Sequence, residues 1–157
     1  MDFMSDCMVN GRKFRTLNIM DDGSREALAI EVDTSLSSKR AIRVLDRIIE
    51  ERGMPESIRT DNGPEFTSKD MELWAKERGI HLQFIQPGRP MQNGYIERFN
   101  RLYREAVLDA YLFFDLNQIK QLTEEWMNEY NERRPHEGLN NLTPEEWKRN
   151  LLLNENN

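Results

Sequence analysis

The sequence predicts an α/β fold in which a five-stranded mixed sheet is flanked by helices on both faces. Three short strand-like segments separated by turn signals begin the chain and predict an antiparallel unit. Two later strands each follow a segment with the apolar spacing of a helix, and a crossover of this kind joins parallel neighbours. The order of three strands, then helix, strand, helix, strand and helix permits one mixed sheet between two helical layers.

The strands at the start of the chain are bounded by two turns. Residues 1–9 alternate between two faces and end at Asn10-Gly11, a dipeptide typical of hairpin turns. The second strand is predicted over 14–20, and a polar turn leads from it into a third strand over 27–32. Connections this short join antiparallel neighbours, so the three strands are expected to be antiparallel.

The middle of the chain alternates helices with strands. Apolar residues recur at helical spacing in two segments, and each segment ends at a glycine that can stop a helix. The predicted elements are a helix that begins at Ser37 or Ser38 and ends at Gly53, a strand containing Ile58, a helix over 68–78 and a strand over 82–85.

The rest of the chain is predicted to be helical after one loop. Residues 86–90 contain two prolines and a glycine, so we expect a mobile loop there. A helix then carries Glu97, and further helices are predicted near 116–130 and from Thr143. The apolar residues of the Glu97 helix are Ile96, Phe99, Leu102, Tyr103 and Ala106.

The length of 157 residues fits one domain. We expect a single catalytic-core unit over 1–157, with the sheet and the Glu97 helix in about 1–110 and a helical extension in about 111–157. No apolar run approaches the roughly 20 residues of a membrane span, and no secretion signal is recognisable at the amino terminus. The single cysteine, Cys7, cannot form an internal disulfide. These features predict a protein of the reducing cytoplasm that does not bind membranes.

Two acidic residues stand out by their position. Asp61 follows a strand-like segment and precedes Asn62-Gly63-Pro64, a turn signal that places the acid at the end of a strand. Glu97 lies on a helix 35 residues further on, counted as 97 − 61 − 1. Either acid has a simpler explanation: Asp61 could only stabilise its turn, and Glu97 could be a solvated residue near a helix N-terminus.

The sequences around the two acids, DNGPEF at 61–66 and QNGYIERFN at 92–100, resemble those of the DDE transposases and retroviral integrases. The closest likeness is to the second-frame transposases of bacterial insertion sequences in the group founded on insertion sequence three. The likeness runs from Asp2 to the Arg134-Pro135-His136 segment and thus covers nearly the whole chain. It implies that the fold is ribonuclease H-like.

The resemblance also implies a metal-dependent active site. Asp2, Asp61 and Glu97 correspond to the catalytic, metal-binding acids of the family, with Asp2 shared between two ions. The alternatives to Asp2 are Asp6, on the same strand face, and Asp21 or Asp22, which lie near a turn. The expected cofactor is Mg²⁺ or Mn²⁺, which prefers oxygen ligands. Two ions are expected when DNA is bound, about 3.5–4 Å apart.

The function implied by the resemblance is DNA transposition. Metal-activated water would nick DNA at an element end, and the freed 3′-hydroxyl would attack a second DNA segment, within an oligomer that forms on double-stranded DNA in the bacterial cytoplasm. Two alternatives stay open: a ribonuclease H-like nuclease without strand transfer, and a core fragment that binds DNA or its own copies without catalysis.

Three further residues are candidates for DNA binding. Arg101 and Arg104 lie four and seven residues after Glu97, near its face of the helix, and a basic residue at the second spacing belongs to the family pattern. Asn93 lies four residues before Glu97 and could contact a phosphate or a base, or could only cap the helix. The arginines could also serve solubility or a helical ion pair.

The net charge of −6 opposes DNA binding, because lysine and arginine supply much of the affinity for phosphates. Bound cations would offset part of this charge, and family members carry separate amino-terminal DNA-binding segments. We therefore expect an isolated catalytic core whose first strand is shortened.

Overall fold

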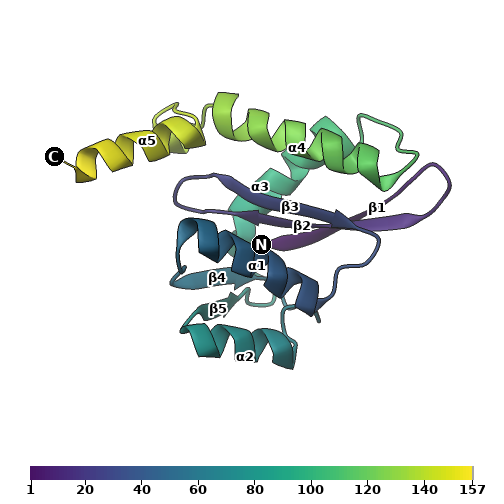
Figure 1. Cartoon of the computed structure of the whole chain (residues 1–157), viewed down its shortest axis with the longest axis horizontal. Coiled ribbons are helices and arrows are strands. Elements are labelled where there is room, and N and C mark those ends of the chain that lie inside the picture. The colour runs from purple at the N-terminus through teal and green to yellow at the C-terminus, as the bar shows by residue number, and fades with distance from the viewer. Residues whose placement is uncertain (157) are drawn as a thin grey trace.

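The computed structural model describes residues 1–156, with only the backbone described at Pro90, and the chain begins with an antiparallel sheet (Figure 1). Strands β1 (Asp2–Cys7), β2 (Lys13–Met20) and β3 (Ala27–Asp33) pair in the order β1-β2-β3. Gly11 has φ +82° in the first hairpin, a conformation that glycine adopts without strain. The three predicted strands and their antiparallel pairing are confirmed.

The prediction of one five-stranded sheet is wrong. Strands β4 (Ser57–Thr60) and β5 (His81–Phe84) form a separate two-stranded parallel sheet. The Met1 amino group donates a 2.8 Å hydrogen bond to the Arg59 carbonyl oxygen of β4, and no further backbone bond joins the two sheets among the described residues. A β-ladder needs backbone hydrogen bonds from successive residues of both strands. Only Met1, the residue before β1, makes such a bond to β4 among the described residues.

Helices α1 (Ser38–Arg52) and α2 (Lys69–Arg78) pack against each other and cover one side of the strands (Figure 1). Each is capped by a serine hydroxyl that accepts a backbone N–H bond, Ser37 for α1 and Ser68 for α2. The buried cluster between these helices and the strands includes Leu17, Val44, Leu45, Phe66, Met71 and Trp74.

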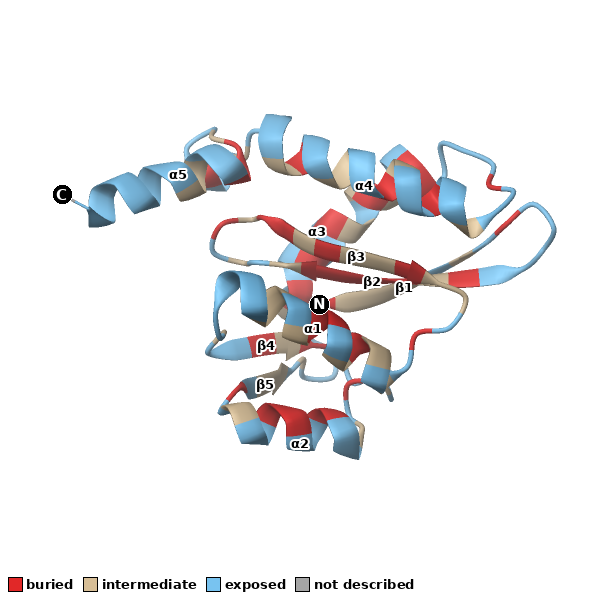
Figure 2. Cartoon of the chain, in the orientation of Figure 1, coloured by how far each residue is buried: buried red, intermediate tan, exposed pale blue. Residues whose placement is uncertain are grey.

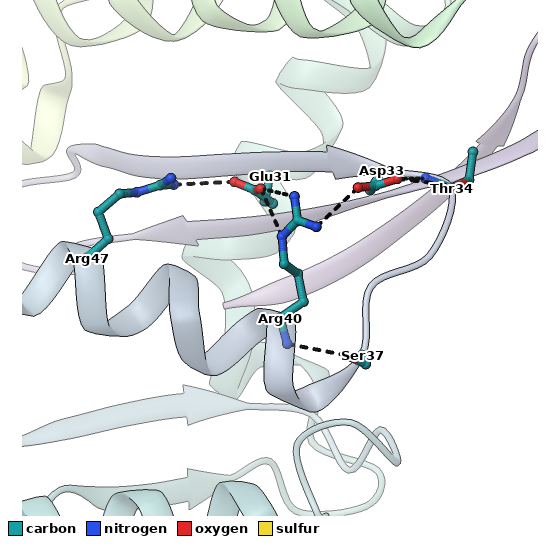
Figure 3. A network of polar contacts seen from close by, with 6 residues as sticks. All are labelled: Glu31, Asp33, Thr34, Ser37, Arg40 and Arg47. Atoms are coloured by element: carbon teal, nitrogen blue, oxygen red, sulfur yellow. Dashed lines mark hydrogen bonds and ion pairs between the residues drawn. The ribbon is translucent and has the colours of Figure 1, made fainter.

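Helix α1 is also attached to β3 by ion pairs along its exposed edge (Figure 3). The Arg40 guanidinium donates to Glu31 at 2.7 Å and to Asp33 at 3.2 Å, while Arg47 donates to the second oxygen of Glu31 at 3.3 Å. Burial raises the pKa of Glu31, but the two guanidinium groups outweigh it and the pKa is lowered. The network therefore favours the ionised carboxylate.

The other face of the antiparallel sheet is covered by α3 (Gly94–Tyr103) and α4 (Leu116–Arg133). A short 3₁₀ helix, η1 (Pro90–Asn93), precedes α3, and the helix continues as a π-helix, η2 (Arg104–Leu108). The wider π turn changes the periodicity, so Ala106 is exposed, contrary to the predicted apolar stripe. Val107 and Leu108 are buried in its place.

An aromatic cluster fastens α4 to α3. Phe99 and Tyr103 of α3 contact Trp126 of α4 with ring centroids 5.4 and 5.3 Å apart, and Phe99 meets Tyr130 edge-on at 5.1 Å. The buried Tyr103 hydroxyl lies 2.7 Å from the Thr123 hydroxyl, and burial raises the pKa of Tyr103 to about 12. Helix α4 therefore belongs to the packed body of the protein.

The last helix, α5 (Pro144–Glu155), follows a 3₁₀ turn, η3 (Glu137–Leu139), and extends away from the strands (Figure 1). Thr143 and Glu146 form a capping box at its start. Most of α5 is exposed (Figure 2). Among the described residues, no helix has the length and apolar character needed to cross a membrane.

Candidate active site

Asp61 lies directly after β4, as predicted. Its Oδ1 accepts the Gly63 N–H at 2.9 Å, which confirms that the side chain stabilises its turn. A Cβ on Gly63 would lie 2.9 Å from the same oxygen, so a side chain at position 63 would displace the Asp61 carboxylate. The Asn62 amide donates to the Ile85 carbonyl at 2.9 Å and links the end of β4 to the segment after β5. Asp61 itself is exposed.

Asp2 of β1 is held near Asp61 by packing between their neighbours. The ring of Phe3 stacks on that of Phe66 with centroids 5.0 Å apart, and Arg15 lies over Phe3 while pairing with Glu65 at 2.6 Å. The segment after Asp61 is thereby fixed against β1. Burial raises the pKa of Asp2, and the charge of Asp61 raises it further.

The Asp2 carboxylate is also held by hydrogen bonds from two directions. Its Oδ1 accepts the Phe3 N–H at 2.8 Å, and its Oδ2 accepts the Asn100 amide of α3 at 2.9 Å. The Asn100 carbonyl oxygen in turn accepts the side-chain amide of Asn18 at 2.8 Å. Asn18 is fully buried and lies opposite Asp2 in the β1–β2 register. The chain from Asn18 through Asn100 orients Asp2 relative to α3.

Glu97 is exposed in the first turn of α3, one turn before Asn100. Residues three apart on a helix have Cβ atoms about 5–6 Å apart, so Glu97 lies near the residue that contacts Asp2. Among the described residues, however, no group of three or more histidine, cysteine or acidic side chains is close enough to hold a metal. The structure therefore brings Asp2 and Asp61 together and does not add Glu97 to them.

The donors at this place suit a hard divalent cation. Asp2 and Asp61 supply carboxylate oxygens, which Mg²⁺ and Mn²⁺ prefer. The mutual repulsion of the two acids, expressed in the raised pKa of Asp2, would be relieved by a cation between them. The residues present thus fit the predicted cofactor.

The predicted DNA-binding residues lie in three different environments. Arg101 is exposed on α3. Arg104, at the start of the π-helix, pairs with Asp6 of β1 at 3.1 Å and donates to the Ser5 carbonyl at 3.2 Å. Asn93 is buried, with 6% of its surface exposed, and lines a pocket of about 650 Å³ formed by the strands, the end of α1, the start of α3 and part of α5.

Two residues of the site, Asn18 and Asn100, were not predicted from the sequence. Asn18 is a polar residue between the apolar Leu17 and Ile19 of the second strand, and Asn100 lies one helical turn after Glu97 in the QNGYIERFN segment. A buried polar side chain is usually hydrogen-bonded, so the position of Asn18 in the strand could have indicated a hydrogen-bond partner. Its connection to Asp2 depends on strand register and helix packing, which the sequence does not show.

The order of strands and helices, with three antiparallel strands followed by a parallel pair, gives a ribonuclease H-like fold. The chain belongs to the integrase core domain family. One family model of that description matches residues 1–90, and a second matches residues 78–144.

The relatives of the chain include proteins of bacterial insertion elements. An uncharacterized 31.7 kDa protein of insertion element IS407 from Burkholderia multivorans is 42% identical over 94% of this chain and 53% of its own length. A protein of insertion element IS476 from Xanthomonas euvesicatoria is 38% identical over 100% of this chain and 45% of its own. The chain therefore spans about half the length of these relatives, and the predicted resemblance is confirmed.

Solved structures of retroviral integrase cores share the fold. The catalytic core domain of BIV integrase superposes with a TM-score of 0.69 at 17% identity, covering 99% of this chain and 97% of that one. The HTLV-2 integrase catalytic core domain in complex with magnesium, in a trimeric form, gives a TM-score of 0.69 at 16% identity over 92% and 93% of the two chains. At these identities the likeness establishes the fold alone.

Proposed function

We propose that the chain is the catalytic core of a DNA transposase that carries out metal-dependent nicking and strand transfer. The observation that supports this most directly is the placement of the two acids: Asn100 of α3 donates to the Asp2 carboxylate at 2.9 Å, and the stacking of Phe3 on Phe66 fixes the segment after Asp61 against β1. Membership of the integrase core domain family and relatives encoded by insertion elements support the choice of DNA as substrate.

In this proposal Asp2, Asp61 and Glu97 hold the divalent cations. A bound cation would activate the attacking oxygen and stabilise charge on the scissile phosphate. The Asn18–Asn100 chain keeps the Asp2 carboxylate directed toward Asp61, and the Gly63 N–H keeps one oxygen of Asp61 fixed. Glu97 would reach the pair when DNA and cations are present, because α3 already carries Asn100 to Asp2.

Arg101, Arg104 and Asn93 are proposed to contact the DNA around these acids. Arg101 is exposed beside Glu97. Arg104 would exchange its ion pair with Asp6 for a phosphate, and Asn93 would need to be uncovered, because it is buried. Transposition brings two DNA ends together, so a homo-oligomer on DNA is part of the proposal. The magnesium-bound core of HTLV-2 integrase occurs in trimeric and dimeric forms. The bacterial relatives support a cytoplasmic location.

The test is nicking of a supercoiled plasmid, and joining of a labelled oligonucleotide with a free 3′-hydroxyl, in the presence of Mn²⁺. Asp61→Asn and Glu97→Gln should each reduce both rates about 100-fold or more while leaving the chain folded, with a far-ultraviolet circular dichroism spectrum that matches the wild type. Asn at position 61 can still accept the Gly63 N–H, so the turn should survive.

Two matched control variants are available in the chain. Asp21 accepts the Gly23 N–H at 2.8 Å in the same kind of turn as Asp61, and Glu72 lies in the first turn of α2 as Glu97 does in α3. Asp21→Asn and Glu72→Gln should keep wild-type rates. Wild-type rates in the Asp61 or Glu97 variants would refute the proposal. Nicking without joining would favour the nuclease alternative.

A further inference from the structure

Three arginines from distant parts of the sequence converge on one surface beside α3. They are Arg25 before β3, Arg98 of α3, and Arg134 after α4, and we call them the arginine cluster. We propose that the arginine cluster binds the phosphates of a DNA duplex. The inference rests on the proposed function only in that DNA is the ligand.

Arg25 is positioned by its backbone and by an aromatic ring. It has φ +59°, and its guanidinium lies over the ring of Tyr95 with the central carbon 3.7 Å from the centroid. Two residues later the Ala27 backbone exchanges two hydrogen bonds with the Asn131 side chain of α4, at 2.8 and 3.0 Å. The segment that carries Arg25 is therefore fixed to both α3 and α4.

Arg98 and Arg134 are brought to the same place by the packing around Tyr130. Phe99, next to Arg98, meets the Tyr130 ring at 5.1 Å, and the His136 ring meets it at 5.2 Å from the other segment. Burial lowers the pKa of His136, and the charges of the arginine cluster lower it further. The same three charges act on Tyr130. All three guanidinium groups thus lie within electrostatic reach of the same two rings.

The cluster carries uncompensated charge in an acidic protein. Within residues 1–156, none of its members forms an ion pair, whereas Arg40, Arg52 and Arg104 each pair with a carboxylate. Arg98 and Arg134 are exposed and Arg25 is partly exposed. Neighbouring positive charges repel one another, and they lower the pKa of His136, which disfavours a further positive charge there. A phosphate anion would relieve this repulsion and can accept two N–H bonds from one guanidinium.

The arginine cluster lies across α3 from the flank that carries Glu97. Tyr95 and Arg98 are three residues apart and share one flank of α3, while Glu97 and Asn100 share the other. The buried residues Ile96 and Phe99 lie on the side of the helix between these flanks. A helix with its side chains is about 10 Å wide, so a DNA duplex lying across α3 would contact both the arginine cluster and the side that carries Glu97.

The inference is tested by binding in the absence of divalent cations, so that cleavage plays no part. The whole chain is titrated against a fluorescein-labelled duplex of about 24 base pairs in EDTA, and anisotropy is measured from about 50 to 200 mM NaCl. Arg25→Gln, Arg98→Gln and Arg134→Gln should each weaken binding roughly 3- to 10-fold. Each should also reduce the slope of log Kd against log salt by about 0.9, the value for one lost phosphate contact.

Two further variants separate a specific site from a general loss of charge. Arg43→Gln removes the same charge from an exposed position on α1 and should change Kd less than about 2-fold. Arg98→Lys keeps the charge and should retain the wild-type salt slope. Wild-type binding by the three cluster variants, an equal loss in Arg43→Gln, or no measurable binding by the wild type at low salt would each overturn the inference.

Failure of the proposed function gives a different result. Asp61→Asn should still lose affinity when a cluster arginine is also replaced, because Asp61 lies outside the cluster and the assay contains no cation. Cluster-dependent binding by a wild-type chain that never nicks DNA would sustain the inference and refute the catalytic proposal. If the cluster variants still nick DNA and bind the duplex as tightly as the wild type, the catalytic proposal would stand and the inference would be refuted.

Discussion

The Asn100 side-chain amide donates a 2.9 Å hydrogen bond to the Asp2 carboxylate and so connects α3 to β1 at the candidate active site. This bond joins residues 98 positions apart in the sequence. Its acceptor side is fixed by β1, and its donor side is fixed by the buried Asn18, which donates to the Asn100 carbonyl oxygen. The orientation of Asp2 thus depends on the packing of α3 against the sheet.

The first prediction concerns Asn100→Ala. Loss of the amide removes a hydrogen bond to a charged group and lets the Asp2 carboxylate rotate, so Mn²⁺ affinity should fall about 10-fold or more. The pKa of Asp2 should rise, since the lost bond favoured its ionised form. Calorimetric titration with Mn²⁺ and carbon-detected NMR titration of Asp2 measure the two effects. Asn128→Ala, at an exposed position on α4, serves as the control, and equal Mn²⁺ affinity in both variants would contradict the role of Asn100.

The second prediction concerns the repulsion between Asp2 and Asp61. Since burial and the Asp61 charge both raise the pKa of Asp2, Asp61→Asn should lower that pKa toward its ordinary value. At pH values between the ordinary and the raised pKa of Asp2, the folded wild type binds more protons than the unfolded chain. The free energy of unfolding therefore falls as the pH rises through that range. Asp61→Asn should therefore raise Tm at pH 7, with the gain disappearing as the pH falls below the pKa of Asp2.

The control for this experiment is Asp21→Asn, which changes an equivalent turn and removes a charge that is not among those acting on Asp2. It should leave the NMR titration of Asp2 unchanged. An unchanged Asp2 titration in Asp61→Asn would mean that the two carboxylates are too far apart to share a cation.

The third prediction concerns the space around Asp61. In Gly63→Ala the added methyl group would meet Asp61 Oδ1 at 2.9 Å, so the carboxylate must move while both acids remain present. Mn²⁺ binding should weaken about 10-fold, and the far-ultraviolet circular dichroism should match that of the wild type. Gly23→Ala places a methyl group 3.3 Å from Asp21 in the comparable turn and should bind Mn²⁺ normally. Full Mn²⁺ affinity in Gly63→Ala would show that Asp61 need not occupy its observed position.

Local signals explain why most elements could be predicted from the sequence. Ser37, Ser68 and Thr143 cap their helices with their own side chains, and Gly79 ends α2 in the left-handed conformation. Each of these signals involves residues within one turn of the chain. The same holds for Asp61, whose turn is formed with Gly63.

The features that could not be predicted depend on residues distant in sequence. The π-helix follows from burying Val107 and Leu108 beside Phe113, and no local signal marks it. The separation of the sheets depends on how far β1 extends alongside β4. The proximity of Asp2 to Asp61 is set by the stacking of Phe3 on Phe66, and the resemblance to integrases, not spacing alone, pointed to that pair.

The last prediction concerns acid stability and the ion pairs of Figure 3. The pKa values of Glu31 and Asp33 are both lowered, because their bonds to Arg40 and to backbone and arginine donors outweigh burial. The unfolded chain binds more protons at these sites, so their contribution to stability is present above about pH 4–5 and is lost as the pH falls through the lowered values. Arg40→Met removes the shared donor and should reduce the free energy of unfolding at pH 7 by about 1–2 kcal/mol, between the values for exposed and buried ion pairs.

The pH dependence distinguishes this loss from a simple packing defect. The free energy of unfolding, measured with urea from pH 7 to pH 3, should fall less steeply in Arg40→Met than in the wild type. The variant has already lost the ion pair that protonation of Glu31 removes in the wild type. Arg149→Met removes an exposed ion pair with Glu145 on α5 and should change stability by less than about 0.5 kcal/mol, with the wild-type pH slope. If Arg40→Met lost stability by the same amount at every pH, Arg40 would act through packing of its side chain on β3. A converging pair of curves at low pH would instead locate the stabilisation in the ionised carboxylates that hold α1 to the sheet.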